Sequence, residues 1–307
     1  MPRALVTGGA GFIGSHLVDA LLAAGWQVRV LDNLATGRRE QVPDEAEFFE
    51  GNVGDSQLAQ QACQAVDVVF HLAARVSVRD SFDFMVEHNT TNVTGTLVML
   101  KAAAAAGVTR FVLASSMAVY ADAEPGTANA ESHPTRPLSP YGISKLAAEE
   151  FVLLAAPAFG VEPVVLRFFN TYGPRQAFSP YVGVVTIFIT RLLQGLPCTI
   201  YGEGEQCRDF VHVSDVVRAC LAAGHESAAV GQCINVGSGR GTTVNELAML
   251  IAKAVVTTPN FTHGPEQSGE LRNSVADLTR ARQLLKYAPA AVLEERLAQL
   301  VAEFRLR

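Results

Sequence analysis

A tyrosine and a lysine at spacing i, i+4 are the residues of this sequence with the clearest capacity for chemistry. Tyr141 and Lys145 lie in a stretch with a helical pattern, where this spacing places both side chains on one face, one turn apart. A free tyrosine has a pKa of about 10 and is a poor base at neutral pH. A nearby ammonium favours the phenolate and would make Tyr141 a better proton acceptor. The same spacing also occurs by chance on amphipathic helices, so its meaning depends on what surrounds it.

A hydroxyl pair supplies the third candidate group. Ser115 and Ser116 stand at the C-terminal end of the expected strand 110–116, and ligands of parallel sheets bind at that edge. A hydroxyl there can hydrogen-bond a reacting alcohol or ketone. We prefer Ser116 for this role, with Ser115 as the alternative if it is Ser115 that faces the site.

A glycine-rich turn follows the first expected strand and opens the first expected helix. Its glycines lack a Cβ, so the backbone can turn tightly and approach a pyrophosphate, while the helix N-terminus offers free N–H groups. The expected cofactor contacts of this turn are Gly8, Gly11, Phe12, Ile13 and Gly14. The turn predicts a dinucleotide site, and a bound nicotinamide cation would further favour the Tyr141 phenolate.

An acidic residue ends the second expected strand. Asp32 can accept hydrogen bonds from an adenosine ribose and would repel a 2′-phosphate, which predicts NAD as the cofactor. Arg38 and Arg39 argue for NADP instead, since arginines can hold a 2′-phosphate. Asp32 weighs more because it stands at the strand end itself. The alternative is an ordinary glycine-rich turn with a surface aspartate.

Composition limits the other possibilities. The chain has 307 residues, of which 49% are hydrophobic, enough for one large α/β domain with a smaller lobe. Its net charge of −6 argues against nucleic acid as a partner. Five cysteines without a close pair predict free thiols in a reducing compartment, and the seven histidines lack metal-ligand spacing, so we expect no metal. The first residues predict a strand, not a signal peptide, and no apolar run approaches the roughly 20 residues of a membrane span, so we expect a cytoplasmic protein.

Short apolar runs alternate with helical patterns over the first 170 residues. The expected strands are 4–7, 28–32, 47–50, 66–72, 110–116 and 163–168, and the expected helices are 13–24, 56–65, 84–106 and 141–156. This alternation predicts an α/β fold with a parallel, doubly wound Rossmann sheet and right-handed crossovers. The strands show little polar alternation, as expected when helices cover both faces.

The alternation of strand and helix patterns changes after residue 170. We expect a loop over 171–178, strands at 199–204, 208–213 and 233–236, and helices at 182–193, 214–223, 244–256, 278–285 and 292–304. These elements predict a cofactor domain over 1–170, with 208–240 rejoining its sheet. A smaller C-terminal substrate-binding lobe is expected over 171–207 and 241–307.

Taken together, these features resemble the extended short-chain dehydrogenase/reductase family, and within it the nucleotide-sugar 4-epimerases of the UDP-glucose type. The matching stretches are 7–16, 32–34, 71–74, 92–96, 141–145, 167–174 and 208–215, so the resemblance covers essentially the whole chain. It implies bound NAD held also by Asn33, Asn52, Val53, Leu72, Ala73, Ala74, Asn92 and Phe168. It implies a nucleotide-sugar substrate held by Asn170, Arg208, Arg272 and Ser274.

The resemblance also implies a reaction. Tyr141 would take the proton of the sugar 4-hydroxyl while hydride passes to NAD, Ser116 would bond the same oxygen, and the 4-keto sugar would turn and be reduced on its other face. Related 4,6-dehydratases have an Asp-Glu pair after the catalytic hydroxyl, whereas this chain has Met117 and Ala118, which transfer no protons. Alternatives are a dehydratase, a decarboxylase, a reductase, or a non-catalytic NAD-binding sensor, although such sensors typically lack the tyrosine or lysine.

Several positions depart from common versions of the family. Asn52 stands where many relatives have an aspartate, Val76 where some epimerases have a lysine, and Ala121 where a glycine is common. None of these changes removes a catalytic group.

The substrate end carries three further expectations. Arg208 and Arg272 are expected to clamp the diphosphate in bidentate geometry, the alternative being surface ion pairs. If Arg272 points at the diphosphate, Ser274 in the same extended segment shares its cleft, and its small size leaves space for N-acetylated hexoses. Asp277 is a plausible N-cap for the helix that follows. The helices 84–106 and 141–156 resemble those of a four-helix interface, so we expect a homodimer.

Overall fold

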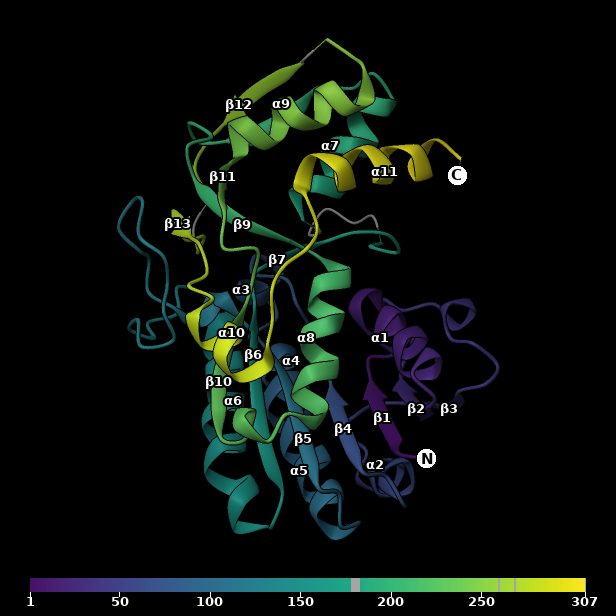
Figure 1. Ribbon diagram of the computed structural model, residues 1–307. Helices are drawn as coiled ribbons and strands as arrows, with labels where there is room; N and C mark the ends of the chain where they lie inside the picture. Colours follow the sequence, from purple (N-terminus) through teal and green to yellow (C-terminus); the bar gives the residue numbers. More distant parts are fainter. Residues whose placement is uncertain (178–182, 259, 268, 307) are drawn as a thin grey trace.

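The computed structural model describes residues 1–177, 183–258, 260–267 and 269–306, which form a larger and a smaller lobe (Figure 1). The larger lobe is built on a seven-stranded parallel sheet in the order β10-β6-β5-β4-β1-β2-β3. Its strands are β1 Arg3–Thr7, β2 Gln27–Asp32, β3 Glu47–Glu50, β4 Val68–His71, β5 Arg110–Ser116, β6 Glu162–Phe168 and β10 Gln232–Val236. The chain order reverses at β1, which lies between β2 and β4, and ligands of such sheets bind at this reversal. The predicted α/β doubly wound fold is confirmed.

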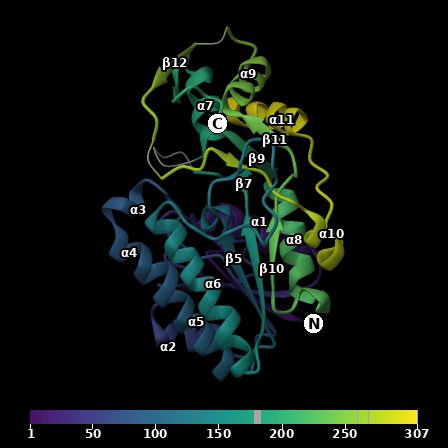
Figure 2. The same ribbon diagram turned by 90° about the vertical axis from the view of Figure 1, so that its left-hand side faces the viewer.

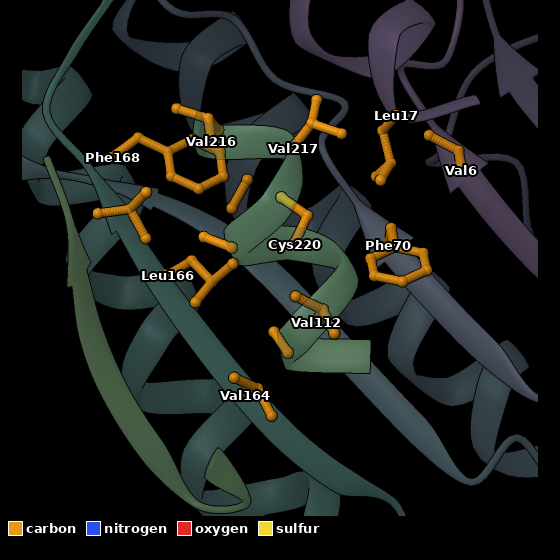
Figure 3. Packing of buried hydrophobic residues seen from close by; sticks show 14 of the residues in the cluster. Val6, Leu17, Phe70, Val112, Val164, Leu166, Phe168, Val216, Val217 and Cys220 are labelled. Carbon is orange, nitrogen blue, oxygen red and sulfur yellow. The ribbon is translucent and has the colours of Figure 1, made fainter. Parts of the chain in front are cut away.

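Helices cover both faces of this sheet (Figure 2). One face packs against α1 Phe12–Ala23, α8 Val213–His225 and α10 Thr279–Leu285, and the other against α2 Ser56–Cys63, α5 Gly95–Ala105 and α6 Pro140–Ala158. Figure 3 shows Val216, Val217 and Cys220 of α8 facing Phe70 and Leu166 of the sheet. Each such fully buried side chain contributes about 1.5–3 kcal/mol of transfer free energy. This packing fixes the strand ends that carry the candidate site.

The smaller lobe has its own core. Its sheet contains β7 Asn170–Tyr172, β9 Cys207–His212, β11 Gly241–Thr243 and β13 Asn273–Ser274, and a second pair is formed by β8 Cys198–Tyr201 and β12 Phe261–Gly264. The helices α7 Val184–Leu193, α9 Val244–Val255 and α11 Leu293–Arg305 pack together above it (Figure 1). Phe188, Leu247, Ile251 and Leu297 are buried between them.

One expected sheet pairing is wrong. We expected the strand at 208–213 to rejoin the central sheet with the one at 233–236, yet only β10 does so, and β9 pairs with β7, β11 and β13. The apolar pattern of β9 requires burial, which either sheet provides, so the pattern does not select the partner. β7 also replaces part of the expected loop at 171–178, of which residue 178 lies outside the described residues. The expected helix at 182–193 begins at Val184 in the structure, and residue 182 is likewise outside the described residues.

The long helix expected over 84–106 is interrupted. α3 Asp80–Asp83 and α4 Met85–Asn89 are followed by a π-helical turn, Thr90–Thr94, before α5 begins. The flanking residues keep helical dihedral angles, so an apolar pattern does not reveal the extra residue of such a turn. Short 3₁₀ turns occur at Arg39–Gln41, Met117–Val119 and Ser227–Ala229.

The helix expected at 278–285 begins one residue later than predicted. Leu278 occupies the N-cap of α10 without a side-chain cap. The expected cap, Asp277, lies one residue earlier, where its Oδ1 accepts a hydrogen bond of 2.7 Å from the Thr279 N–H.

Candidate active site

The glycine turn between β1 and α1 is shaped so that side chains do not fit. Gly8 has φ +70°, and a Cβ on it would lie 2.9 Å from the backbone nitrogen of Ala73. A Cβ on Gly14 would lie only 2.1 Å from the Gly8 carbonyl oxygen. Gly11 is the N-cap of α1 and provides no side-chain hydrogen bond to its first turn. The turn therefore presents bare backbone beside the segment after β4, an arrangement suited to a pyrophosphate.

The predicted adenosine side gathers at the end of β2. The Asp32 carboxylate is largely buried and accepts hydrogen bonds from the N–H groups of Ala10 (3.0 Å) and Leu34 (2.8 Å). The Asn33 amide donates a hydrogen bond of 2.6 Å to Asn52 Oδ1. This bond links two further predicted cofactor contacts. The competing Arg39 lies over the Phe48 ring, 4.8 Å from its centroid.

Of the other predicted cofactor contacts, Leu72 and Ala73 lie against this turn, whereas Val53 lies beside α5. Val53 is buried beside Gly95, where a Cβ would meet Val53 Cγ2 at 2.6 Å. Leu72 and Ala73 pass under Gly8, as the close approach at that glycine shows. These residues and the glycine cradle fit a dinucleotide.

Tyr141 is brought to the strand end by the start of α6. Ser139 caps this helix by accepting the Gly142 N–H at 3.1 Å, with a proline at the first helical position. A Cβ on Gly142 would lie 2.3 Å from the Ala118 carbonyl oxygen, so only glycine allows α6 to approach the chain after β5 so closely. This approach brings the Ser116 hydroxyl near the Tyr141 side chain, where it acts to lower the pKa of Tyr141.

Burial is the main cause of the pKa shifts of Tyr141 and Lys145. Burial raises the pKa of Tyr141, opposed by the nearby Ser116 hydroxyl. We expected Lys145 to lower the pKa of Tyr141, but burial, which raises this pKa, has the larger effect. Burial lowers the pKa of Lys145 to about 8, opposed by the charge of Glu149, and its ammonium donates to the Ala114 carbonyl oxygen at 2.9 Å.

Asn92 ties the segment after β4 to α6. Its amide donates to Ser144 Oγ at 2.9 Å and to the Arg75 carbonyl oxygen at 3.0 Å, while its Oδ1 accepts from the Arg75 N–H at 2.9 Å. Ser144 in turn donates to the Tyr141 carbonyl oxygen at 2.7 Å. Ala74, a predicted cofactor contact, precedes Arg75 in this clamped segment.

A buried histidine extends this network to the glycine turn. His71 Nδ1 lies 2.8 Å from Thr7 Oγ1, and its Nε2 lies 2.9 Å from Thr96 Oγ1. Thr7 accepts from the Ala73 N–H at 3.2 Å and Thr96 donates to the Asn92 carbonyl oxygen at 2.7 Å. The Thr96 hydroxyl gives its proton to Asn92, so it accepts a hydrogen bond from His71 Nε2. Burial lowers the pKa of His71 to about 3, so the ring is neutral and its Nδ1 accepts from the Thr7 hydroxyl. The sequence pattern alone did not point to this role.

The two serines of β5 have different hydrogen-bond partners. Ser115 donates to Glu149, a fully buried carboxylate that also forms an ion pair of 2.6 Å with Arg167 of β6. Glu149 follows Lys145 by one helical turn, a spacing that could have pointed to it. Phe168, a predicted nicotinamide-side contact, is in register with Ser116 across the sheet.

The predicted substrate contacts combine buried polar atoms with arginines. Asn170 Oδ1 and Ser274 Oγ are buried without a hydrogen-bond partner among the described residues. The Arg208 side chain is 8% exposed and donates from Nη1 to the carbonyl oxygens of Cys207 (3.1 Å) and Arg272 (3.2 Å). Ser274 is in register with Arg208 on the neighbouring strand.

Arg272 is placed differently from the expectation. Its side chain is 72% exposed and pairs with Glu266 at 3.0 Å, whereas Ser274 is buried. The structure therefore brings Ser274, and not the Arg272 guanidinium, beside the buried arginine of β9.

Neither a metal cluster nor a membrane-spanning helix occurs in the described part of the chain. Within it, His, Cys, Asp and Glu residues form no group of three suited to a metal ion. No described helix is both long and apolar enough to cross a membrane.

Comparisons with known proteins match this geometry. Residues 4–237 match the model of the NAD dependent epimerase/dehydratase family, and the chain belongs to this family. It is 39% identical over 309 residues to the UDP-glucose 4-epimerase of Mycolicibacterium smegmatis, covering 99% of this chain and 98% of that one.

Two solved structures are similar over their whole length. A UDP-glucose 4-epimerase from Thermotoga maritima, solved with UDP-glucose, has a TM-score of 0.95 and 38% identity, covering 99% of both chains. The Thermus thermophilus UDP-glucose 4-epimerase, solved with NAD, has a TM-score of 0.92 and 38% identity, again with 99% coverage of both.

Proposed function

We propose that this protein epimerises C4 of a nucleotide-linked hexose, interconverting UDP-glucose and UDP-galactose. The observation that supports this most strongly is the Ser116 hydroxyl near Tyr141, at the same sheet edge as the glycine turn. A hydroxyl acid–base pair of this kind suits proton exchange with a sugar alcohol.

The residues of the chain would divide the work as follows. Tyr141 accepts the proton of the sugar 4-hydroxyl and later returns it, and Ser116 hydrogen-bonds the same oxygen. Lys145 keeps a positive charge near this pair below a pH of about 8. Bound NAD, held by the glycine turn and Asp32, supplies reversible hydride transfer at C4. Asn92 keeps the catalytic helix and the segment after β4 in fixed relation.

Other reactions on this scaffold are less well supported by the residues. Met117 and Ala118 follow Ser116 at the start of a 3₁₀ turn, and neither side chain transfers a proton. A dehydratase or decarboxylase that needs an acid at this point would lack one here. A non-catalytic NAD-binding sensor would have no use for the hydroxyl pair that the chain keeps.

The substrate would span the two lobes. We propose that 1–170 together with α8 and β10 bind the cofactor, and that the remainder of 171–307 holds the nucleotide sugar. Arg208 would meet the diphosphate, and Asn170 would lie near the sugar. Ser274 is small and buried next to Arg208, which supports acceptance of N-acetylated hexoses.

We also propose a cytoplasmic homodimer. Apolar side chains on α4 and α6 are exposed, including Met85 (57%), Val86 (74%), Ile143 (57%) and Leu154 (80%). Such a surface suits burial against the same helices of a second copy. All five cysteines are free thiols, which suits a reducing compartment.

Incubation with a panel of nucleotide sugars, followed by chromatography of the products, tests the reaction. We expect conversion between UDP-glucose and UDP-galactose with no net formation of NADH. Release of carbon dioxide from a uronic-acid substrate would favour a decarboxylase. Stoichiometric consumption of NADH by a keto sugar would favour a reductase, and either result without epimerisation would overturn the proposal.

A further inference from the structure

Two arginines from different lobes share one glutamate. Arg79 follows β4 in the larger lobe, and its Nη2 lies 3.2 Å from Glu270 Oε1. Arg208 of β9 in the smaller lobe lies 3.6 Å from Glu270 Oε2. The two guanidinium groups therefore converge on the two oxygens of one carboxylate.

Further contacts hold the Arg79 side chain at the smaller lobe. Its guanidinium lies 4.8 Å from the centroid of the Tyr201 ring, at the end of β8. The neighbouring Phe82 packs so closely on the segment before β13 that a Cβ on Gly269 would lie 2.9 Å from Phe82 Cε2. Arg79 thus reaches from the larger lobe to residues of the smaller lobe.

The contact of Glu270 with Arg208 is incomplete. At 3.6 Å it is longer than a hydrogen bond, although the Arg208 side chain is buried and a buried cation needs a close anionic partner. A phosphate offers the same fork geometry as a carboxylate, and a diphosphate brings more negative charge. A diphosphate is therefore a better partner for two convergent guanidinium groups than a single carboxylate.

We propose that Arg79 is the second guanidinium of the diphosphate site, opposite Arg208, and that Glu270 is an internal anion which the diphosphate displaces. This inference rests on the proposed function, because it assumes a nucleoside diphosphate in the cleft. It gives Arg272 no direct part, since that side chain is exposed and paired with Glu266.

Calorimetric titration of the NAD-loaded protein with UDP, UMP and uridine tests the assignment. We expect Arg79→Gln to weaken UDP binding about tenfold, as for loss of one charge-assisted contact, and to leave uridine binding unchanged. Arg272→Gln is the matched control, an arginine of the same region also paired with a glutamate, and should bind UDP as wild type does. Glu270→Gln should tighten UDP binding, whereas Glu266→Gln should not.

Two results would overturn the inference. One is an Arg79→Gln variant that binds UDP as wild type while Arg208→Gln loses it. The other is an equal loss for UDP and uridine, which would make Arg79 a strut between the lobes. NAD content and thermal unfolding of each variant show that it is folded.

Epimerase activity is measured separately. If wild type binds UDP with the expected dependence on Arg79 but epimerises no nucleotide sugar, only the proposed function fails. If wild type does not bind UDP, both proposals fail.

Discussion

The surroundings of α6 and the smaller-lobe strands β7 and β13 differ in how completely their polar groups are paired. Near α6, the side chains of Lys145 and Asn92 are hydrogen-bonded to other parts of the chain. On β7 and β13, Asn170 Oδ1 and Ser274 Oγ are buried without a partner among the described residues. The helix with Tyr141 and Lys145 is thus tied to the rest of the protein, while the smaller lobe has hydrogen-bonding capacity to offer a ligand.

This difference has energetic consequences. A buried polar group without a partner is destabilising by about 1–3 kcal/mol, and a ligand that pairs with it recovers this free energy on binding. The bonded groups around α6 gain nothing comparable, because their contacts already exist. Changes near α6 should therefore alter rate or stability, and changes on β7 or β13 should alter substrate choice.

The largest effect is expected at Tyr141. Tyr141→Phe keeps the ring packed against His88, 6.2 Å between ring centroids, but removes the hydroxyl. Loss of the general base should lower kcat by about 10²–10⁴-fold with NAD still bound. The matched control is Tyr120→Phe, another buried tyrosine, whose hydroxyl donates to Asn235 at 2.6 Å away from the proposed reaction. It should lose stability yet keep its turnover per folded molecule, and near wild-type turnover in Tyr141→Phe would exclude the proposed base.

A smaller effect, on selectivity, is expected at Ser274. A tyrosine at this buried position would fill space beside Arg208, and overpacking of this kind costs about 1–3 kcal/mol. We expect Ser274→Tyr to lower the ratio of kcat/KM for UDP-GlcNAc over UDP-glucose at least about tenfold. Ser274→Ala, which adds no bulk, should keep the wild-type ratio. Rejection of UDP-GlcNAc by wild type, or a ratio unchanged by the tyrosine, would contradict the proposal.

The pH dependence of kcat should report the ionisation of Lys145. Because the pKa of Lys145 is lowered to about 8, its charge is present below that pH and is lost as the pH rises through it. We expect kcat to fall as the pH is raised through about 8. Lys145→Arg carries a charge that does not titrate in this range, so this limb should disappear even if the overall rate is lower. A limb that stays at the same pH in Lys145→Arg belongs to another group.

The effect least tied to turnover is expected in the acid stability contributed by His71. Its pKa is about 3 when folded and about 6.5 in an unfolded chain, so unfolding takes up a proton between these values. Stability should therefore decrease as the pH falls from about 6.5 toward 3. His71→Gln should be less stable at neutral pH but show a shallower decrease, by about 1.4 kcal/mol per pH unit within this window. Denaturant unfolding at several pH values measures this, with the exposed His225→Gln as a control whose slope should match wild type.

Features encoded by neighbouring residues could be predicted from the sequence. The glycine turn, the strand ending at Asp32 and the helix with Tyr141 and Lys145 depend on short-range patterns, and the structure places them together. The long-range partners could not be predicted in the same way. Arg79 and Glu270 are separated by 191 positions, and no periodicity links them.

Two other differences between the prediction and the structure have similar causes. The apolar residues of β9 satisfy burial in either sheet, so their pattern did not identify the smaller one. In the segment 272–274, alternation predicted a shared face but not that the Arg272 side chain would extend outward to Glu266.

The π-helical turn at Thr90–Thr94 separates the winding of the helix from the placement of the Asn92 side chain. Such a turn is an α-helix with one residue added, so removing one residue there would return the segment to regular winding and leave α5 in phase with its neighbours. The chain could thus become one residue shorter at this point and still form a continuous helix. Asn92 would then rotate away from Arg75 and Ser144, which makes this the place where a change in chain length would uncouple folding from catalysis.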